Sequence, residues 1–174
     1  MHIYIVNGAP GCGKTTFEEI VHSIYEDTHI LSVIDPIKIA AKILGWDGNK
    51  EEGGRLLLCN LKDWADKNLD STHKYIKNSL RRISKTYEVF DVDDDMAIVF
   101  IDAREIEDIE YFKKKYGAKS VFINREIEYV PTCHADQINK EYEYDIYINN
   151  LWDEDTLKKA ARDFLNMEGI KIPQ

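Results

Sequence analysis

The sequence predicts an α/β fold, a three-layer sandwich in which a mostly parallel five-stranded sheet is covered by helices on both faces. Two observations lead to this prediction. Segments that resemble strands alternate along the chain with segments whose apolar residues recur every three or four positions, and this alternation is typical of parallel strands joined by helical crossovers. Residues 97–101 are also continuously apolar, as expected of a strand that is buried on both faces.

The first half of the chain supplies two of the strands and four helices. We expect a strand at residues 2–7, followed by a glycine-rich stretch and a helix that begins at about Lys14. A second strand is expected at residues 30–34, and Pro36 then opens a helix, because proline is favoured in a first helical turn. Between residues 51 and 86 the periodicity is helical throughout, which predicts two further helices.

The second half supplies the remaining three strands. The acidic run at residues 91–95 is expected to be a solvated loop that precedes the apolar strand ending in Asp102. A helix then runs from about residue 106 to 115. Strands at residues 120–123 and 144–148 and a final helix at residues 156–165 complete the pattern.

Composition excludes several classes of protein. The chain has 174 residues, of which 44% are hydrophobic and 32% charged, as in a folded soluble domain. The longest apolar run is far too short to cross a bilayer, and the formal net charge of -9 disfavours a nucleic acid polymer as partner. Three cysteines without a CxxC pair argue against disulfides and a structural zinc site, so we expect a cytoplasmic protein.

The most specific motif is the segment from Gly8 to Thr15, which matches G-x-x-x-x-G-K-[ST] between a predicted strand and a predicted helix. Glycines let successive N–H groups face one anion, and the following helix adds its positive end. Lys14 is expected to reach the terminal phosphates as a catalytic cation, and the Thr15 hydroxyl to bind magnesium. The residues expected to bind the nucleotide are Gly8, Ala9, Pro10, Gly11, Cys12, Gly13, Lys14, Thr15 and Thr16.

Polar residues at the carboxyl ends of the predicted strands are the next candidates. Asp102 is expected to hold magnesium or to orient the nucleophile, although an aspartate here could also cap the helix that follows. Arg104 lies at the same end of the sheet, where ligands bind in open α/β folds, and is a candidate for both catalysis and substrate binding; a surface ion pair is the alternative. Arg125 follows the fourth strand, where a mobile lid would begin, and could neutralise charge that develops during phosphoryl transfer.

Three further residues are candidates for binding a substrate. Asp35 and Lys38 follow the second strand, and the alternative is that they belong to another capped helix without contacting a substrate. Arg55 lies on a predicted helix, where most arginines are simply solvated.

Two cysteines have features that suggest additional chemistry. Cys12 lies within the glycine-rich loop, where N–H dipoles could favour a reactive thiolate, although a small side chain facing away from the nucleotide is the alternative. Cys133 is adjacent to His134, but no other cysteine or histidine lies at ligand spacing along the sequence. We therefore expect no metal at the Cys133–His134 pair.

Taken together, these motifs resemble the P-loop deoxynucleoside monophosphate kinases of bacteriophages, within the nucleoside monophosphate kinase family. The resemblance covers nearly the whole chain. It rests on the glycine-rich loop, residues 35–38 with the helix and 45–48 segment that follow, residues 55–57, residues 101–104 and residues 144–150. It implies a P-loop fold that binds ATP and Mg²⁺ at the loop, with a monophosphate held after the second strand and by the D-x-R segment. The family pattern commonly continues with proline and asparagine after that segment, whereas this chain reads Glu105-Ile106-Glu107-Asp108.

The expected function is therefore transfer of the γ-phosphoryl group of ATP to a nucleoside or deoxynucleoside monophosphate. Residues 1–174 would form one kinase domain with a helical substrate-side insertion at about 45–90 and a lid at about 124–140. Small-molecule nucleotides are the expected partners, no membrane is expected to be one, and a homodimer stays open. The alternatives are a kinase for another phosphorylated metabolite or a polynucleotide end, and a nucleotide-binding switch that signals by changing conformation.

Overall fold

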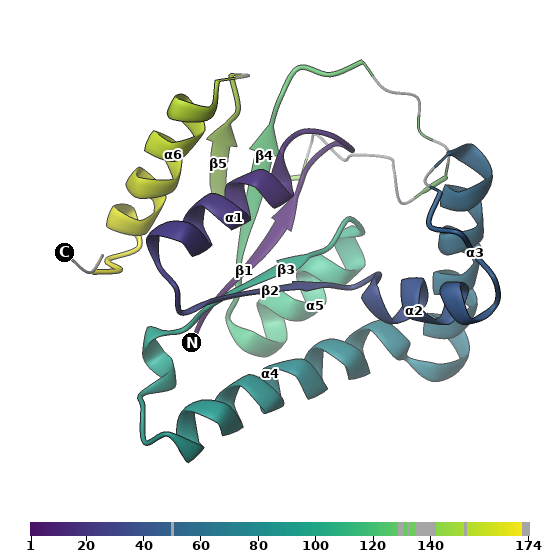
Figure 1. Ribbon diagram of the computed structural model, residues 1–174, viewed down its shortest axis with the longest axis horizontal. Helices are drawn as coiled ribbons and strands as arrows, with labels where there is room; N and C mark the ends of the chain where they lie inside the picture. The colour runs from purple at the N-terminus through teal and green to yellow at the C-terminus, as the bar shows by residue number, and fades with distance from the viewer. Residues whose placement is uncertain (50, 129–130, 132, 135–141, 152, 172–174) are drawn as a thin grey trace. The chain divides into compact units, whose positions relative to one another are not determined.

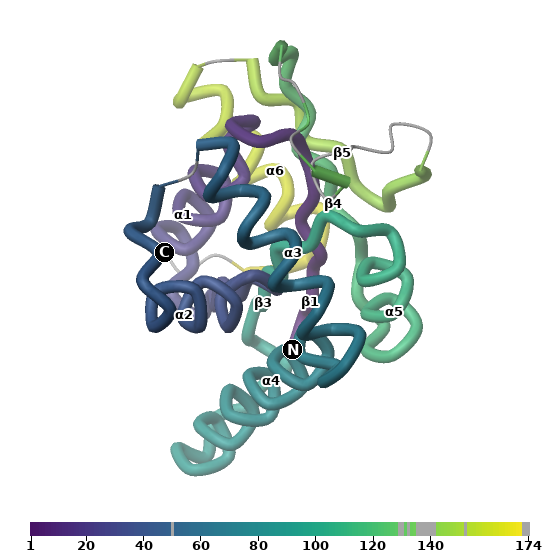
Figure 2. Tube along the Cα trace, turned by 90° about the vertical axis from the view of Figure 1, so that its right-hand side faces the viewer, coloured from purple at the N-terminus to yellow at the C-terminus, as the bar shows by residue number. Residues whose placement is uncertain are grey.

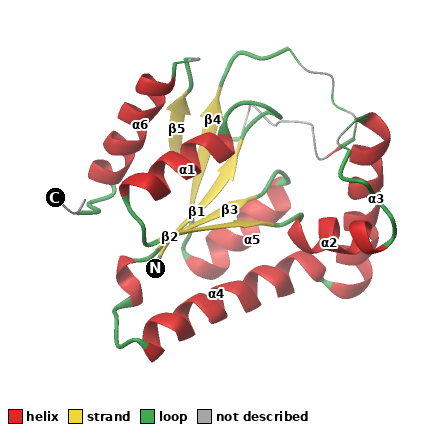
Figure 3. Ribbon diagram, in the orientation of Figure 1, coloured by secondary structure: helices red, strands yellow, loops and turns green. Residues whose placement is uncertain are grey.

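The computed structural model describes residues 1–49, 51–128, 131, 133–134, 142–151 and 153–171, and Figure 3 shows that strands and helices alternate along most of them. The elements, in chain order, are β1 (His2–Asn7), α1 (Lys14–Ile24), β2 (Thr28–Ser32), α2 (Asp35–Ile43), α3 (Glu52–Leu69), α4 (Ser71–Val89), the 3-10 turn η1 (Asp94–Met96), β3 (Ile98–Asp102), α5 (Ile106–Tyr116), β4 (Lys119–Asn124), β5 (Ile146–Asn149) and α6 (Glu154–Met167).

The five strands form one sheet in the order β2-β3-β1-β4-β5 (Figure 1). β1 pairs in parallel with β3 on one side and β4 on the other, and β4 pairs in parallel with β5. Because β1 occupies the middle of the sheet, the loop that follows it lies between the carboxyl ends of its two neighbours, where ligands bind in parallel sheets. The predicted fold class is therefore confirmed.

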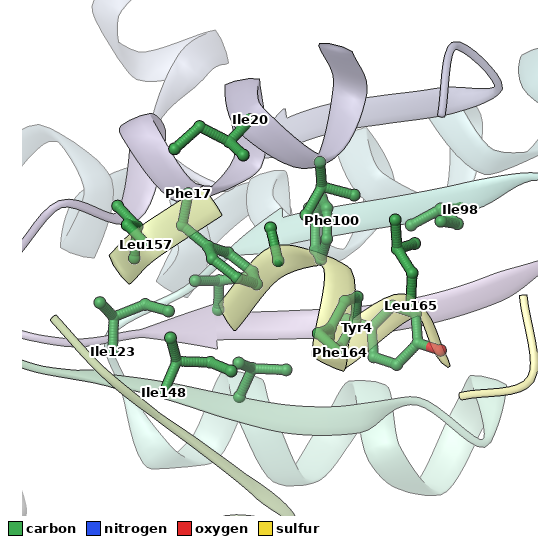
Figure 4. Packing of buried hydrophobic residues seen from close by; sticks show 14 of the residues in the cluster. Tyr4, Phe17, Ile20, Ile98, Phe100, Ile123, Ile148, Leu157, Phe164 and Leu165 are labelled. Carbon is green, nitrogen blue, oxygen red and sulfur yellow. The ribbon is translucent and has the colours of Figure 1, made fainter. Parts of the chain in front are cut away.

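One face of the sheet is covered by α1 and α6, and side chains from the sheet and from both helices interdigitate there (Figure 4). Tyr4, Phe17, Phe100 and Phe164 are each no more than 1% exposed, and their rings contact one another at centroid distances of 4.9 to 6.1 Å. Tilted and edge-on contacts of this kind add to the free energy gained by burial. This aromatic cluster fixes α1, and with it the start of the helix after the loop, against the sheet.

The opposite face is covered by α5, which lies on the other side of β1 from α1 in Figures 1 and 2. Successive side chains of a strand point to opposite faces, so Ile5, Val99 and Ile101 turn away from the aromatic cluster. All three are fully buried, as are Ile109 and Phe112 of α5. Burial on both faces explains why the sequence of β3 is continuously apolar.

The bounds of the second, fourth and fifth strands differ by one or two residues from those predicted, and for two of these strands the structure shows the cause. The second strand ends at Ser32 rather than at residue 34, because the Asp35 carboxylate accepts a hydrogen bond from the Ser32 N–H at 3.2 Å and α2 begins at Asp35. The fifth strand begins at Ile146 rather than at residue 144, because the Asp145 carboxylate instead accepts hydrogen bonds from the N–H and hydroxyl of Ser120. In both cases an aspartate side chain replaces the strand ladder as hydrogen-bond partner. The acidic run predicted as a loop contains the short turn η1.

The chain divides into two compact units, which we name the sheet unit (residues 1–30, 94–129 and 138–174) and the helical unit (residues 31–93 and 130–137). The helical unit contains α2, α3 and α4, and α2 packs against α3 through Ile37, Ala41, Leu58 and Ala65. The predicted insertion at about 45–90 falls on α3 and α4. Most of the predicted lid at about 124–140 lies outside the described residues. Among the described helices, none is both long and apolar enough to cross a membrane.

Candidate functional site

The loop after β1 has a backbone that only glycine can follow without strain. Gly8, Gly11 and Gly13 have φ values of 147°, 81° and 97°, which L side chains rarely adopt. Space is also lacking at two of these positions. A Cβ atom on Gly8 would lie 2.5 Å from the carbonyl oxygen of Ile123, and one on Gly13 would lie 2.5 Å from the side-chain nitrogen of Asn150. The glycines of the motif are therefore required by both conformation and packing.

Helix α1 begins directly at the end of this loop, and its first N–H groups have no acceptor within the helix. Its first helical hydrogen bond runs from the Phe17 N–H to the Gly13 carbonyl at 2.9 Å, so the N–H groups of Lys14, Thr15 and Thr16 have no acceptor within the helix. The first turn contains no acidic side chain, and the Thr15 and Thr16 side chains are exposed. The positive end of α1 is thus directed at the loop, and no acidic side chain of its own first turn neutralises it, as suits an anion-binding site.

The Lys14 side chain folds back over the loop. Its ammonium group donates hydrogen bonds to the carbonyl oxygens of Gly8 at 2.8 Å and Ala9 at 3.2 Å, and it lies 3.9 Å from the sulfur of Cys12. The ammonium group is therefore held within the concave side of the loop by neutral acceptors. A phosphate oxygen would be a stronger acceptor for it than a carbonyl, because the hydrogen bond would then join two charged groups.

Asp102 lies beside the loop. It is paired with Val6 across β1 and β3, and the N–H of Ala103 donates to the Val6 carbonyl at 3.2 Å. The alternative role as a helix cap is excluded, because α5 begins at Ile106, has Glu105 as its N-cap residue and has no side-chain cap. The carboxylate also raises the pKa of both Cys12 and Glu18 through its charge, which places its negative charge close to the loop.

Three side chains hold the loop in place. Buried Asn7 accepts a hydrogen bond from the Gly8 N–H through its side-chain oxygen at 2.6 Å and donates to the Arg104 carbonyl at 3.1 Å. Asn150, at the end of β5, donates from its side chain to the Cys12 carbonyl at 2.8 Å. Arg125 donates to the Gly11 carbonyl at 3.2 Å. The sheet unit therefore brings the loop, Asp102 and Arg125 together, with the backbone of Arg104 linked to the loop through Asn7.

Glu18 is a residue of this site that the sequence reasoning missed. It lies one helical turn after Lys14, is fully buried, and neither carboxylate oxygen has a hydrogen-bond partner among the described residues. The pKa of Glu18 is raised to about 8; burial is the largest cause, the charge of Asp102 adds to the rise and that of Lys14 opposes it. One feature of the sequence could have indicated this residue. Glu18 lies four residues after Lys14 and three before Val21, so it shares a helix face with them rather than lying on the solvent side.

The structure corrects the expectation that the loop activates the thiol of Cys12. This side chain is fully buried, and burial raises its pKa although the ammonium group of Lys14 lowers it. Desolvation of the thiolate therefore outweighs the favourable charge. The alternative of a small side chain that packs beneath the loop describes the site better.

The remaining candidates lie in the helical unit. Asp35 and Lys38 form an ion pair across one turn of α2 at 3.2 Å, and the charge of Asp35 also raises the pKa of Tyr75 on α4, where burial is the larger cause. Asp35 does not cap α2, whose N-cap residue is Ile34. Arg55 lies in the first turn of α3 and is half-buried.

Comparison with known proteins gives little further information. No protein-family model and no curated protein matches the sequence. Among solved structures, the chain is similar to a sugar kinase from Janibacter sp. HTCC2649 in its unliganded form, with 15% sequence identity, a TM-score of 0.44 and 95% of each chain covered. At this level of similarity, neither the fold nor the activity of that protein can be transferred to this chain. The candidate site therefore stands on its own geometry.

Proposed function

We propose that this protein is an ATP-dependent kinase that transfers the γ-phosphoryl group to a nucleoside or deoxynucleoside monophosphate. The observation that carries the proposal is the loop at residues 8–16, in which glycines with positive φ, the N–H groups of a helix start and the ammonium group of Lys14 converge. Nothing in this arrangement suits a neutral ligand, whereas a chain of phosphates matches its charge and its donors.

The residues around the loop also fit a magnesium–ATP complex. Glycine at positions 8 and 13 lets the loop pack closely against Ile123 and Asn150, because a Cβ at either position would lie 2.5 Å from one of these residues. The Thr15 hydroxyl, which is exposed at the helix start, and the Asp102 carboxylate provide the hard oxygen donors that Mg²⁺ prefers. Magnesium, when bound there, offsets the negative charge of the β- and γ-phosphates.

The protein's own contribution to the reaction is charge stabilisation and positioning. Phosphoryl transfer needs little covalent chemistry from the enzyme. Lys14 would leave the carbonyl groups of Gly8 and Ala9 to hold the transferring phosphoryl group, and Arg125, which already contacts Gly11, would supply a second positive charge. Both charges would act in a partly desolvated loop, where electrostatic stabilisation is stronger than in water.

The acceptor part of the proposal rests on the resemblance to nucleoside monophosphate kinases and on the cations available. Arg104 is the candidate of the sheet unit for binding the acceptor phosphate. In the helical unit the candidates are Lys38 and Arg55, and Asp35 would orient Lys38 through their ion pair. If this assignment is right, Arg104→Ala raises the Michaelis constant for the acceptor much more than that for ATP.

The experiment that tests the proposal is transfer of radiolabel from γ-labelled ATP to a panel of nucleoside and deoxynucleoside monophosphates. Labelled diphosphate formed with one of these acceptors supports the proposal. Transfer only to another phosphorylated metabolite or to a polynucleotide end would support the kinase activity but contradict the proposed nucleoside monophosphate acceptor. Slow release of phosphate with no acceptor labelled would instead favour a nucleotide-dependent switch.

A further inference from the structure

A cluster of three potential metal ligands lies within the helical unit, outside the site described above. Cys59 and Asp63 are four residues apart on α3, so their side chains share one face of the helix. His134, 75 residues beyond Cys59 in the sequence, faces the same point. One ligand atom from each residue lies within 4.8 Å of the other two.

The separations between these atoms match those in a tetrahedral site. The Cys59 sulfur lies 3.9 Å from Nε2 of His134, and this nitrogen lies 3.2 Å from a carboxylate oxygen of Asp63. For zinc bonds of about 2.3 Å to sulfur and about 2.1 Å to nitrogen and oxygen, tetrahedral angles require about 3.6 Å between sulfur and nitrogen and about 3.4 Å between nitrogen and oxygen. The two observed separations differ from these values by about 0.3 Å or less.

The surroundings of the three side chains are also suitable. Cys59 is only 7% exposed, yet it does not belong to the apolar cluster of the helical unit and faces an imidazole instead. The side chains of Asp63 and His134 are 49% and 48% exposed, so an ion could enter and water could complete the coordination. The neighbouring cation on α3, Lys62, is drawn to Asp66 by an ion pair at 2.9 Å.

We propose that Cys59, Asp63 and His134 bind one zinc ion, with water as the fourth ligand. A thiolate and an imidazole favour a softer ion such as zinc over magnesium, which prefers oxygen ligands. The bound ion would cross-link His134, which lies between β4 and β5 in the chain, to α3. This proposal is independent of the proposed kinase activity.

The test uses the full chain after treatment with a chelator. Titration with Co²⁺ is expected to give a thiolate-to-metal charge-transfer band and the visible bands of tetrahedral cobalt, at one ion per chain, and Zn²⁺ is expected to displace the cobalt. Zinc should also raise the melting temperature, because an ion that binds only the folded chain stabilises it. Excess Mg²⁺ should leave the cobalt bands unchanged.

Variants separate this site from adventitious binding. Cys59→Ser and His134→Gln are expected to weaken zinc binding by more than about 100-fold, because even loss of an outer-shell partner costs about 10- to 100-fold. Cys133→Ser, next to His134, and His73→Gln, which removes the contact between His73 and Asp70 at the start of α4, are controls expected to bind like the parent.

His134→Gln is the variant least able to disturb folding, since this side chain is half exposed. Circular dichroism and melting without metal verify that it folds. Absence of the thiolate–cobalt band in the parent, or binding that persists unchanged in both Cys59→Ser and His134→Gln, would overturn the proposal and leave only a hydrogen-bonded cluster.

Discussion

The buried carboxyl group of Glu18 should make the stability of the protein depend on pH. Its pKa is raised from 4.5 to about 8 in the folded chain, with burial as the largest cause. The folded state therefore holds this proton more tightly than the unfolded state does. Stability contributed by the protonated group is complete below about pH 4.5 and is lost progressively as the pH rises to about 8.

The magnitude follows from the difference between the two pKa values. The difference between about 8 and 4.5 is about 3.5 pH units, and at about 1.4 kcal/mol per unit this amounts to at most about 5 kcal/mol. Glu18→Gln removes the titrating group and keeps its shape. Relative to the parent, the variant should therefore gain up to about 5 kcal/mol between about pH 4.5 and pH 9, or roughly 10 to 20 °C in melting temperature for a chain of this size.

The assay is urea denaturation of the parent and of Glu18→Gln across this pH range. Any cost of burying the new amide does not depend on pH, so the change in the difference between the two proteins isolates the titration. Glu26→Gln, at an exposed position just after the same helix, is the matched control and should run parallel to the parent. A difference between parent and Glu18→Gln that stays constant from about pH 4.5 to pH 9 would refute the reasoning.

Three further predictions concern the loop and its neighbours. Gly13→Ala should lower stability by about 1 to 3 kcal/mol and weaken ATP binding, because its φ is 97° and the new Cβ would meet Asn150. Gly117→Ala, at a positive φ with open space around it, is the control in denaturation and ATP titrations, and an equal loss of ATP affinity in both variants would contradict the prediction. Asp102→Asn should raise the magnesium concentration needed for half-maximal turnover at fixed ATP, because a carboxylate near the loop is lost; an unchanged magnesium curve would remove Asp102 from the metal site. Iodoacetamide should label half-buried Cys133 faster than Cys12, whose thiol is buried and has a raised pKa, and peptide mass mapping that finds Cys12 labelled first would show that the loop activates its thiol after all.

The fold was accessible from the sequence because local patterns determine most of its elements. The continuous apolar run of β3 reflects burial on two faces, and the three- and four-residue spacing in α1 reflects burial on one. The ends of the second and fifth strands were mispredicted because an aspartate side chain there competes with the backbone as a hydrogen-bond acceptor. Asp35 and Asp145 each accept hydrogen bonds next to a strand end, and periodicity carries no information about such bonds.

The candidate site was only partly accessible for a similar reason. The glycine-rich loop is a local motif, so its strained backbone could be predicted from eight residues. Asn150 and Glu18 act through contacts with the folded loop and with Asp102, and residue type alone does not reveal them. The cluster of Cys59, Asp63 and His134 joins residues 75 positions apart, which ligand spacing along the sequence cannot detect.

The most direct test of the central claim is the rate of γ-phosphoryl transfer by Lys14→Ala. Removing a cation directed at the transferring group should lower turnover by about 100-fold or more. The melting temperature should stay near that of the parent, because Lys14 is half-buried and its ammonium group contacts two loop carbonyls and the neighbouring sulfur among the described residues. Lys159→Ala, an exposed lysine on α6, should transfer phosphate at the parental rate. A folded Lys14→Ala variant that retains near-parental turnover would contradict the account of the loop as the site of phosphoryl transfer.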